Sequence, residues 1–287
     1  MSFVSKFKTW SEMIKLEHTL FSLPFVIASA LIAIHYKNFQ DYSLISLVWI
    51  GLCLLAARSL GMTLNRIYDA DIDAKNPRTK TREIPVGKIS KKQAWVFAIL
   101  SLVLHVYSAF QLPVLCQLLL PIALIWLFSY SWMKRVTWLC HFVLGTTLGG
   151  ATLGAWIAVT GDLTSLAPVY LSLAVSFWVA GFDIYYSTQD MEFDKKNKLN
   201  SIPVKFGKTA AIKIARFSHL LTPVFLYLVG EELGFGLFYK AGIFLVIVAL
   251  YYEQKLVAEN KIEAAFFMVN SWISVVICAF VALEIFI

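Results

Sequence analysis

Nine apolar runs follow one another along the chain, and each approaches the length of about 20 residues that an α-helix needs to cross a bilayer. They lie near residues 19–36, 43–64, 94–112, 113–133, 139–160, 166–187, 211–230, 234–252 and 263–287. A spanning helix satisfies all of its own backbone hydrogen bonds, which lipid does not supply. We therefore expect an all-α, polytopic membrane protein with about nine transmembrane helices. Eight is the alternative, because the division at Gln111-Leu-Pro113 is narrow.

Charged residues make up 15% of the sequence and hydrophobic residues 59%. A soluble domain has roughly 25% charged residues, so lipid is the expected partner of most of this surface. All but four of the 25 Lys and Arg fall in the N-terminal segment or in alternate connecting segments, namely 71–92, 133–139, 195–216 and 253–263.

Loops rich in Lys and Arg stay in the cytoplasm. The pattern thus predicts a multi-pass protein, in a bacterial inner membrane, with its N-terminus on the cytoplasmic side. A nucleic-acid partner is disfavoured, because acids interrupt the basic loops and membrane helices flank them.

Two of the predicted helices end in acids spaced four residues apart, and each set is followed by Lys and Arg. The first acid ladder is Asn65, Asp69 and Asp73, and the second is Asp183, Asp190 and Asp194. Residues four apart share one face of a helix, so each ladder is expected to form a column of oxygen atoms. Such oxygens suit Mg²⁺, which binds a few carboxylates together with substrate phosphates. A single Asp in this position has a simpler explanation as a helix cap or an ion-pair partner, but two matching ladders favour a metal–phosphate site.

The two ladders also indicate an internal duplication. Ile84-Pro85-Val86-Gly87 follows the first, and Ile202-Pro203-Val204 with Gly207 follows the second, at an offset near 120 residues. The chain 1–287 is thus expected to be one domain with repeats at approximately 15–135 and 136–257, and a ninth helix at 263–287. Each repeat has four spans, so the two keep the same orientation, and their ladders are expected to converge on a central cavity.

The motifs resemble those of the UbiA superfamily of intramembrane aromatic prenyltransferases over essentially the whole chain. The resemblance rests on the two ladders, on Asn76-Pro-Arg-Thr with Arg82, on Ser201-Ile-Pro, and on Tyr130-Ser-Trp-Met-Lys-Arg. It implies transfer of a polyprenyl group from polyprenyl diphosphate to an aromatic ring, with Mg²⁺ as cofactor.

Many members carry Asn-Asp where this chain has Asn65-Arg66, which leaves the role of that Asp unassigned here. The Asn-Arg form, with Lys15-Leu-Glu-His-Thr-Leu-Phe, is most similar to the branch that prenylates 4-hydroxybenzoate or 1,4-dihydroxy-6-naphthoate in ubiquinone or menaquinone biosynthesis. The acceptor is thus expected to be a small aromatic acid.

The resemblance and the spacing together suggest site residues. The metal ligands would be Asn65, Asp69, Asp73, Asp190 and Asp194. The diphosphate would bind Arg66, Arg78, Arg82, Lys134, Arg135 and Lys205, although a basic loop residue can also serve only to set topology. Asp69, Asp190, Asp183 and Lys134 would be catalytic.

The acceptor and the prenyl cation require further groups. Arg58 lies within a membrane segment, where an isolated charge is costly, so it is expected either to bind an anionic substrate group or to form a structural pair with a backbone carbonyl or an acid. Tyr130 and Tyr186 would face the cation with their π-systems. Asp183 would orient the acceptor's hydroxyl group or take the ring proton. Four glycines at small-residue spacing, Gly145, Gly149, Gly150 and Gly154, are expected to permit close helix packing.

A cation-coupled transporter is the alternative function, because such proteins also use repeats and intramembrane acids. Transporter sites tend to lie near the bilayer centre, however. Here the acids lie at helix ends beside basic loops, which favours an enzyme that acts on a charged head group.

Overall fold

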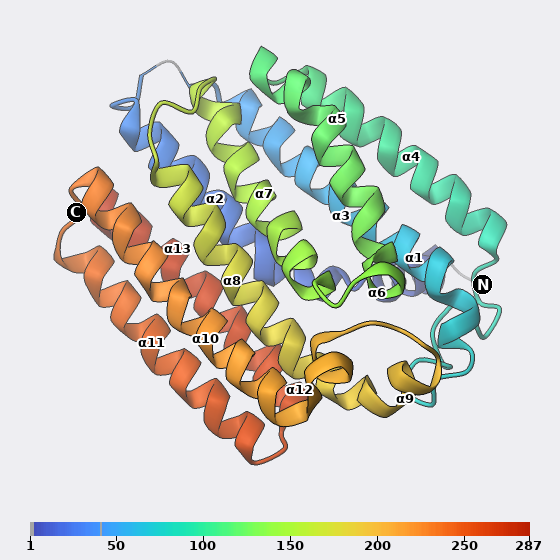
Figure 1. Cartoon of the computed structure of the whole chain (residues 1–287). Helices are drawn as coiled ribbons and strands as arrows, with labels where there is room; N and C mark the ends of the chain where they lie inside the picture. Colours follow the sequence, from blue (N-terminus) through green and yellow to red (C-terminus); the bar gives the residue numbers. More distant parts are fainter. Residues whose placement is uncertain (1–2, 41) are drawn as a thin grey trace.

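The computed structural model describes residues 3–40 and 42–287, and this part of the chain is a bundle of helices without strands (Figure 1). Its α-helices are α1 (Phe3–Met13), α2 (Thr19–Tyr36), α3 (Leu44–Asp73), α4 (Lys91–Phe110), α5 (Val114–Ser129), α6 (Met133–Val136), α7 (Cys140–Thr160), α8 (Ala167–Ser187), α9 (Met191–Lys196), α10 (Ile202–Leu233), α11 (Leu237–Ala258), α12 (Ile262–Ala264) and α13 (Asn270–Phe286). Three 3₁₀ turns, η1 (Leu16–His18), η2 (Tyr130–Trp132) and η3 (Thr188–Asp190), and one π-helical turn, η4 (Ala265–Val269), connect or extend them.

The described residues contain eight helices that are long and apolar enough to span a membrane, and α2 adds a shorter apolar helix. The nine predicted runs therefore each form a helix, in the predicted order, and the all-α polytopic fold is confirmed. The narrow division is also real, since α4 ends at Phe110 and α5 begins after Pro113. Helix α1 and the C-terminal end of α13 lie at opposite ends of the bundle (Figure 1).

Two helices are longer than their apolar runs. The predicted span 43–64 continues as α3 to Asp73, so the whole first ladder is helical. The predicted span 211–230 begins early, at Ile202, where the side chain of Ser201 accepts a hydrogen bond from the backbone N–H of Val204 as an N-cap. Hydropathy missed the extension of α3 because polar residues continue a helix once its first turns are established. The early start of α10 is different, because a kink at Gly207, where φ is 80°, separates the first turn from the rest of the helix.

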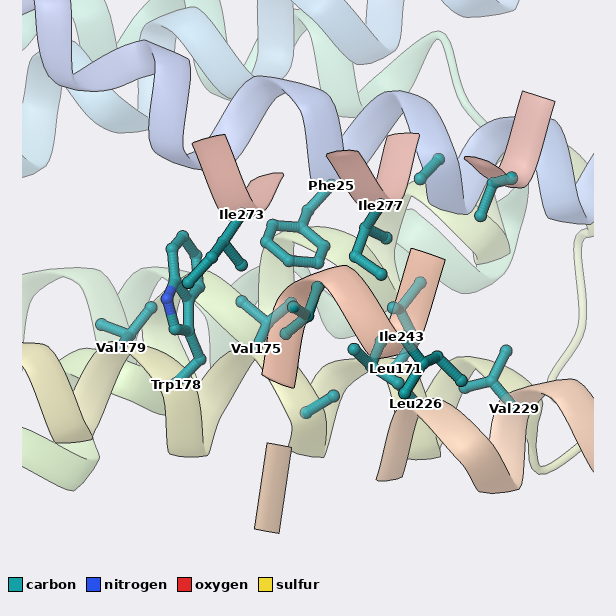
Figure 2. Close-up of a cluster of buried hydrophobic side chains, with 14 of the residues drawn as sticks. Phe25, Leu171, Val175, Trp178, Val179, Leu226, Val229, Ile243, Ile273 and Ile277 are labelled. Atoms are coloured by element: carbon teal, nitrogen blue, oxygen red, sulfur yellow. The ribbon is translucent and has the colours of Figure 1, made fainter. Parts of the chain in front are cut away.

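Helix α8 is the most buried of the long helices, and its apolar side chains form the centre of the main hydrophobic cluster (Figure 2). Trp178 is fully buried there, beside Phe25 of α2 and Ile273 of α13. Its indole N–H donates to Asn270 Oδ1 over 2.7 Å, and Asn270 in turn donates to the buried carboxylate of Glu253 over 3.1 Å. These bonds fix α8, which leads into the second ladder, against α11 and α13.

Close packing also fixes α8 against α7. A Cβ added to Gly145 would lie 2.2 Å from the backbone carbonyl oxygen of Ser176, and one added to Gly149 would lie 2.4 Å from that of Ser172. A Cβ at Gly150 or Gly154 would meet nothing within 4 Å. Close packing was predicted for all four glycines, and two of them are at the contact.

Candidate active site

Both acid ladders line a single cavity of about 260 Å³ at the end of the bundle where α3 and α8 finish. The walls come from α3, the loop that follows it, η2 with α6, the start of α7, and the segment from α8 to α9. All six ladder residues are in the lining, so the tertiary structure brings together two motifs more than 100 residues apart in sequence.

The first ladder is one regular face of α3. Asn65 donates from Nδ2 to Asp69 Oδ2 over 3.0 Å, one turn further on. The other oxygen of Asp69 accepts a hydrogen bond of 2.7 Å from Arg135 Nη2. Arg82 donates from Nη1 to both oxygens of Asp73, over 2.8 and 2.7 Å. Each acid of this ladder is therefore paired with a basic side chain.

The second ladder is not a straight column, unlike the sequence-based expectation. Helix α8 ends at Ser187, and the 3₁₀ turn η3 precedes α9. Ser187 and Thr188 donate their hydroxyls to the carbonyl oxygens three residues earlier, over 2.8 and 2.7 Å. Such side-chain bonds compete with the regular α-helical pattern. The chain bends there, and both Asp190 and Asp194 are buried beside the cavity.

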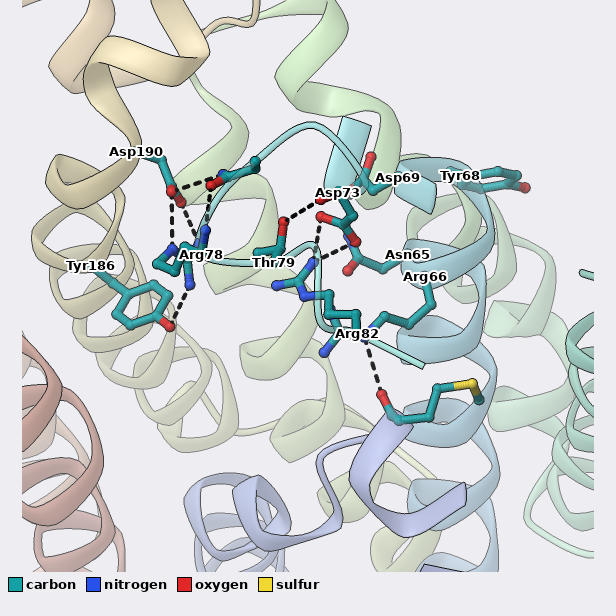
Figure 3. A network of polar contacts seen from close by, with 12 residues as sticks. Asn65, Arg66, Tyr68, Asp69, Asp73, Arg78, Thr79, Arg82, Tyr186 and Asp190 are labelled. Atoms are coloured by element: carbon teal, nitrogen blue, oxygen red, sulfur yellow. Dashed lines mark hydrogen bonds and ion pairs between the residues drawn. The ribbon is translucent and has the colours of Figure 1, made fainter. Parts of the chain in front are cut away.

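The loop after α3 connects the two ladders (Figure 3). Arg78 reaches across the cavity, donating from Nε to Asp190 Oδ1 over 3.0 Å and from Nη2 to Asp190 Oδ2. Its Nη1 donates to the hydroxyl of Tyr186 over 2.7 Å. Burial opposes the charge of Arg78, but the hydrogen bonds and the negative charge of Asp190 outweigh it and raise the pKa of Arg78 above its ordinary value. Arg78 therefore remains a cation.

Asn76 sets the conformation of this loop. Its Oδ1 accepts a hydrogen bond of 2.9 Å from the backbone N–H of Arg78, and its Nδ2 donates to Asp190 Oδ1 over 3.2 Å. Thr79 adds a hydroxyl bond of 3.2 Å to the carbonyl oxygen of Asp73. The turn chemistry of the Asn-Pro-Arg-Thr sequence thus places the guanidinium group of Arg78 on the second ladder.

The fourth ion pair joins Lys134 to Asp194 over 3.1 Å. Four acids of the ladders and four basic side chains therefore neutralise one another around the cavity: Asp69 with Arg135, Asp73 with Arg82, Asp190 with Arg78, and Asp194 with Lys134. An incoming phosphate would attract the basic groups, and an incoming divalent cation would attract the acids.

The donor set fits Mg²⁺ in chemical type, since it consists of carboxylates and an amide and contains no soft ligand. No group of three or more His, Cys, Asp or Glu in the described part of the chain is arranged to hold a metal ion. Four of these carboxylates are each paired with a basic side chain. The residues therefore suit a cation that arrives together with phosphate oxygens, which would draw the Arg and Lys side chains away from the acids.

Asp183 lies in the cavity wall and has a partner that sequence reasoning did not identify. The side chain of His141 is fully buried, and its Nδ1 atom lies 2.7 Å from Asp183 Oδ2. The opposite ring nitrogen accepts a hydrogen bond of 3.3 Å from the backbone N–H of Ile202. No sequence motif marks His141, because only the packing of α7 against α8 and α10 brings it to Asp183.

Both predicted tyrosines line the cavity. Tyr130 donates its hydroxyl to the carbonyl oxygen of Gly61 in α3 over 2.7 Å, which fixes its ring against that helix. The ring of Tyr186 lies 4.9 Å from the guanidinium carbon of Arg78 and packs against Phe266 with the ring centroids 4.5 Å apart. Aromatic faces therefore adjoin the charged part of the site.

Three predicted site residues are not in the cavity lining. Arg58 donates to the carbonyl oxygen of Lys15 over 3.0 Å, and Arg66 donates to that of Met13 over 3.2 Å. Both thus bind the segment at the end of α1, in agreement with the alternative in which Arg58 pairs with a backbone carbonyl. Lys205 is exposed, with its Nζ 4.5 Å from the centre of the Trp138 ring. The other predicted site residues all line the cavity.

Asn76 and Thr79 also line the cavity, although the set of site residues inferred from sequence did not include them. Their signal was present in the sequence, in the Asn-Pro-Arg-Thr motif. This motif contains Arg78 and also forms the turn that positions it. The turn is the feature of the sequence that indicates Asn76 and Thr79.

Comparison with known sequences gives consistent matches. The model of the UbiA prenyltransferase family matches residues 22–281. A 4-hydroxybenzoate octaprenyltransferase from Saccharophagus degradans is 30% identical over 240 residues, which cover 83% of this chain and 79% of that protein. A polyprenyl transferase from Arthrobotrys oligospora is 36% identical over 183 residues, which cover 60% of this chain. The match spans about half (48%) of the length of that fungal protein.

Solved structures agree in fold. The apo structure of a UbiA homologue from Aeropyrum pernix has a TM-score of 0.85 and 30% sequence identity, and the alignment covers 93% of this chain and 98% of that one. A UbiA homologue from Archaeoglobus fulgidus, solved with GPP and Mg²⁺, has a TM-score of 0.70 at 20% identity, with coverage of 96% and 99%. At that identity the second match shows the fold alone.

Proposed function

The chain belongs to the UbiA prenyltransferase family, and from this membership we propose that it transfers a polyprenyl group from polyprenyl diphosphate to a small aromatic acid. The acceptor would be 4-hydroxybenzoate or, alternatively, 1,4-dihydroxy-6-naphthoate, in ubiquinone or menaquinone biosynthesis. The name of the Saccharophagus degradans relative supports the first of these.

The observation that carries the proposal is the set of four ion pairs around one cavity, in which the basic groups could bind phosphate and the acids could bind a divalent cation. Arg78, Arg82, Lys134 and Arg135 would bind the diphosphate oxygens and offset the charge that develops on the leaving group. The cavity suits a polar head and a small ring, and a long prenyl chain would extend from it between apolar helices.

Asn65, Asp69, Asp73, Asp190 and Asp194 would hold Mg²⁺, which would act as a Lewis acid on the diphosphate oxygens. The Archaeoglobus fulgidus homologue that was solved with GPP and Mg²⁺ has the same fold. Once their basic partners turn to phosphate, these acids would otherwise lie uncompensated in a buried site, which is costly.

Stabilisation of the prenyl cation and removal of the ring proton would depend on two tyrosines and one acid of the cavity wall. Tyr130 and Tyr186 would face the allylic cation and keep water from it. The bond from the prenyl C1 atom to the diphosphate oxygen breaks first, with its electron pair leaving on the diphosphate, and the acceptor carbon then forms a bond to C1 of the cation. The ring proton at the new bond then leaves, its C–H electron pair restores the aromatic ring, and Asp183 would accept the proton.

The acids lie where α3 and α8 end, beside basic loops. This placement suits a substrate whose head lies at the membrane surface and whose tail lies in lipid. Neither the site nor the comparisons give support to the transporter alternative. The charge pattern places the N-terminus and this site on the cytoplasmic side, in our proposal of a bacterial inner membrane.

A single incubation tests the proposal. Purified protein in detergent would receive geranyl diphosphate, MgCl₂ and a panel of aromatic acids, and mass spectrometry would search for products heavier by one geranyl group. We expect one C-prenylated acid and its loss in excess EDTA, with recovery when Mg²⁺ is restored. Absence of prenylated product from every acid would refute the transfer, and undiminished product in EDTA would refute the metal requirement alone.

A further inference from the structure

His141 occupies a bridging position behind the cavity wall. Its ring lies between a carboxylate of α8 and the first backbone N–H of α10, and its side chain is fully buried. Neither the sequence motifs nor the family match assigns it a role. A buried imidazole with a different partner on each nitrogen has its proton placed by those partners.

The two contacts fix the tautomer. The N–H of Ile202 donates to Nε2, so that nitrogen uses its lone pair and carries no proton. The ring proton is therefore on Nδ1, which donates to Asp183 Oδ2 over 2.7 Å. A doubly protonated ring would set one N–H against another at Ile202.

The backbone geometry explains why this N–H is available. Ile202 is the first residue of α10, where the N–H groups have no partner within the helix. The N-cap Ser201 accepts from Val204 and leaves the N–H of Ile202 for His141. Two residues before Ile202, the backbone N–H of Asn200 donates to the carbonyl oxygen of Lys134 over 2.6 Å. This bond holds the start of α10 beside the cavity.

The bond from His141 occupies one oxygen of Asp183. Asp183 is one-quarter exposed, lines the cavity, and has no other hydrogen bond within the described part of the chain. The second oxygen, Oδ1, is left for a group in the cavity.

Resting on the proposed function, we propose that His141 is a positioning residue that holds the Asp183 carboxylate ready to receive the ring proton of the prenylated acceptor. The proton passes to Oδ1 as the C–H electron pair returns to the ring, while the Nδ1–H of His141 stays on Oδ2 and fixes the angle of the carboxylate. His141 itself neither gains nor loses a proton in this step.

The simpler alternative is that His141 only ties α7 to the start of α10. Two substitutions separate the roles because each keeps one of the two bonds. In His141→Asn the side-chain amide lies near the place of Nδ1 and still donates to Asp183. In His141→Gln the longer side chain reaches the place of Nε2 and still accepts from Ile202, but it loses the bond to Asp183.

Steady-state kinetics of both variants would be measured with geranyl diphosphate, Mg²⁺ and the acid that the wild-type protein prenylates. We expect His141→Asn to keep kcat within about threefold and His141→Gln to lower kcat roughly 10- to 100-fold, the scale of a catalytic group misplaced by about 1 Å. The KM for geranyl diphosphate should stay within about threefold in both. The opposite ranking, or equal activity of the two variants, would overturn the positioning role.

Asp183→Asn keeps the test decisive if neither variant of His141 folds. It should reproduce the kinetic profile of His141→Gln, with a lower kcat and an unchanged KM for geranyl diphosphate, and normal turnover by this variant would overturn the proposal. Failure of the wild-type protein to prenylate any acid would instead refute the proposed function, so the two failures are distinguishable.

Discussion

Four of the five ladder carboxylates are each paired with an Arg or Lys side chain, and three of these four, Asp73, Asp190 and Asp194, are buried. Removing one member of a buried pair leaves its partner uncompensated. Here the basic partners are a fifth to a third exposed, so water compensates them in part. Loss of an acid is therefore expected to affect ligand binding more than folding.

Asp69→Ala and Asp190→Ala should each lower kcat/KM by at least about 100-fold, because each removes a ligand from a different ladder and a bound metal contributes several kcal/mol. Asp71→Ala is the matched control on the same helix as Asp69, since Asp71 is 83% exposed and pairs with Lys91 outside the cavity. Prenyl-transfer assays would be read beside size-exclusion profiles. Retention of most activity by either ladder variant contradicts a site built from both ladders.

The carboxylate of the proposed acid acceptor would need a fixed cation, and the structure separates the two candidates. Lys134 lines the cavity, whereas Arg58 binds the carbonyl oxygen of Lys15. Lys134→Met should raise the KM for the acid acceptor roughly 10- to 150-fold, as expected for loss of a charge-assisted hydrogen bond of about 1.5–3 kcal/mol.

Arg58→Met is the comparison for this substitution. It should leave the KM for the acid nearly unchanged and lower the thermal stability, because it releases the segment that follows α1. Normal acid binding by the Lys134 variant would mean that another basic residue of the cavity holds the carboxylate.

Among the elements, the contact between α7 and α8 is the one that sets the second ladder relative to the rest of the site. It depends on Gly145, whose neighbours are backbone atoms of Ser176, and on Gly149, which faces the backbone carbonyl oxygen of Ser172 as well as the hydroxyl of Ser176; backbone atoms do not rotate away as side chains do. A methyl group at such a contact must separate the helices or distort them.

Gly149→Ala is therefore expected to destabilise the protein by about 1–3 kcal/mol and to reduce activity, because α8 carries Asp183 and leads to Asp190. Gly150→Ala, one residue along the same helix, has open space at its Cβ and should be neutral or more stable by up to about 1 kcal/mol. Thermal unfolding of the two variants in detergent measures the difference. Equal melting temperatures would show that α7 and α8 tolerate a wider separation.

Across the whole molecule, the charge pattern predicts the orientation of the bundle in the membrane. Lys91 and Lys240 are each half exposed in an ion pair, and they lie at the starts of α4 and α11. From the distribution of basic residues we expect Lys91 on the cytoplasmic side with the candidate site and Lys240 on the other side.

A membrane-impermeant maleimide applied to intact cells should label Lys240→Cys and leave Lys91→Cys unlabelled until the membrane is opened. The unsubstituted protein, with four cysteines in its apolar segments, provides the background. The reverse labelling pattern would place the site outside the cytoplasm and contradict the proposed orientation.

The sequence by itself determined the membrane architecture and most of the site. Apolar length fixes where helices cross lipid, since the alternative is unsatisfied backbone, and the nine runs emerged in order. The ladders predicted the kind of ligand, because acids beside basic loops at helix ends suit few ligands other than a metal and a phosphate. The internal repeat remains a prediction.

Only the tertiary structure decided which charges meet. The sequence suggested that Arg58, Arg66 and Arg78 bind anionic substrate groups, yet the first two bind carbonyl oxygens near α1 and the third crosses to the opposite ladder. The contact between His141 and Asp183 depends on the packing of α7, α8 and α10, and no local pattern encodes it. The physical reason is one of range: hydrophobic length and helix periodicity act along the chain, whereas the partner of a charge depends on which helices pack side by side.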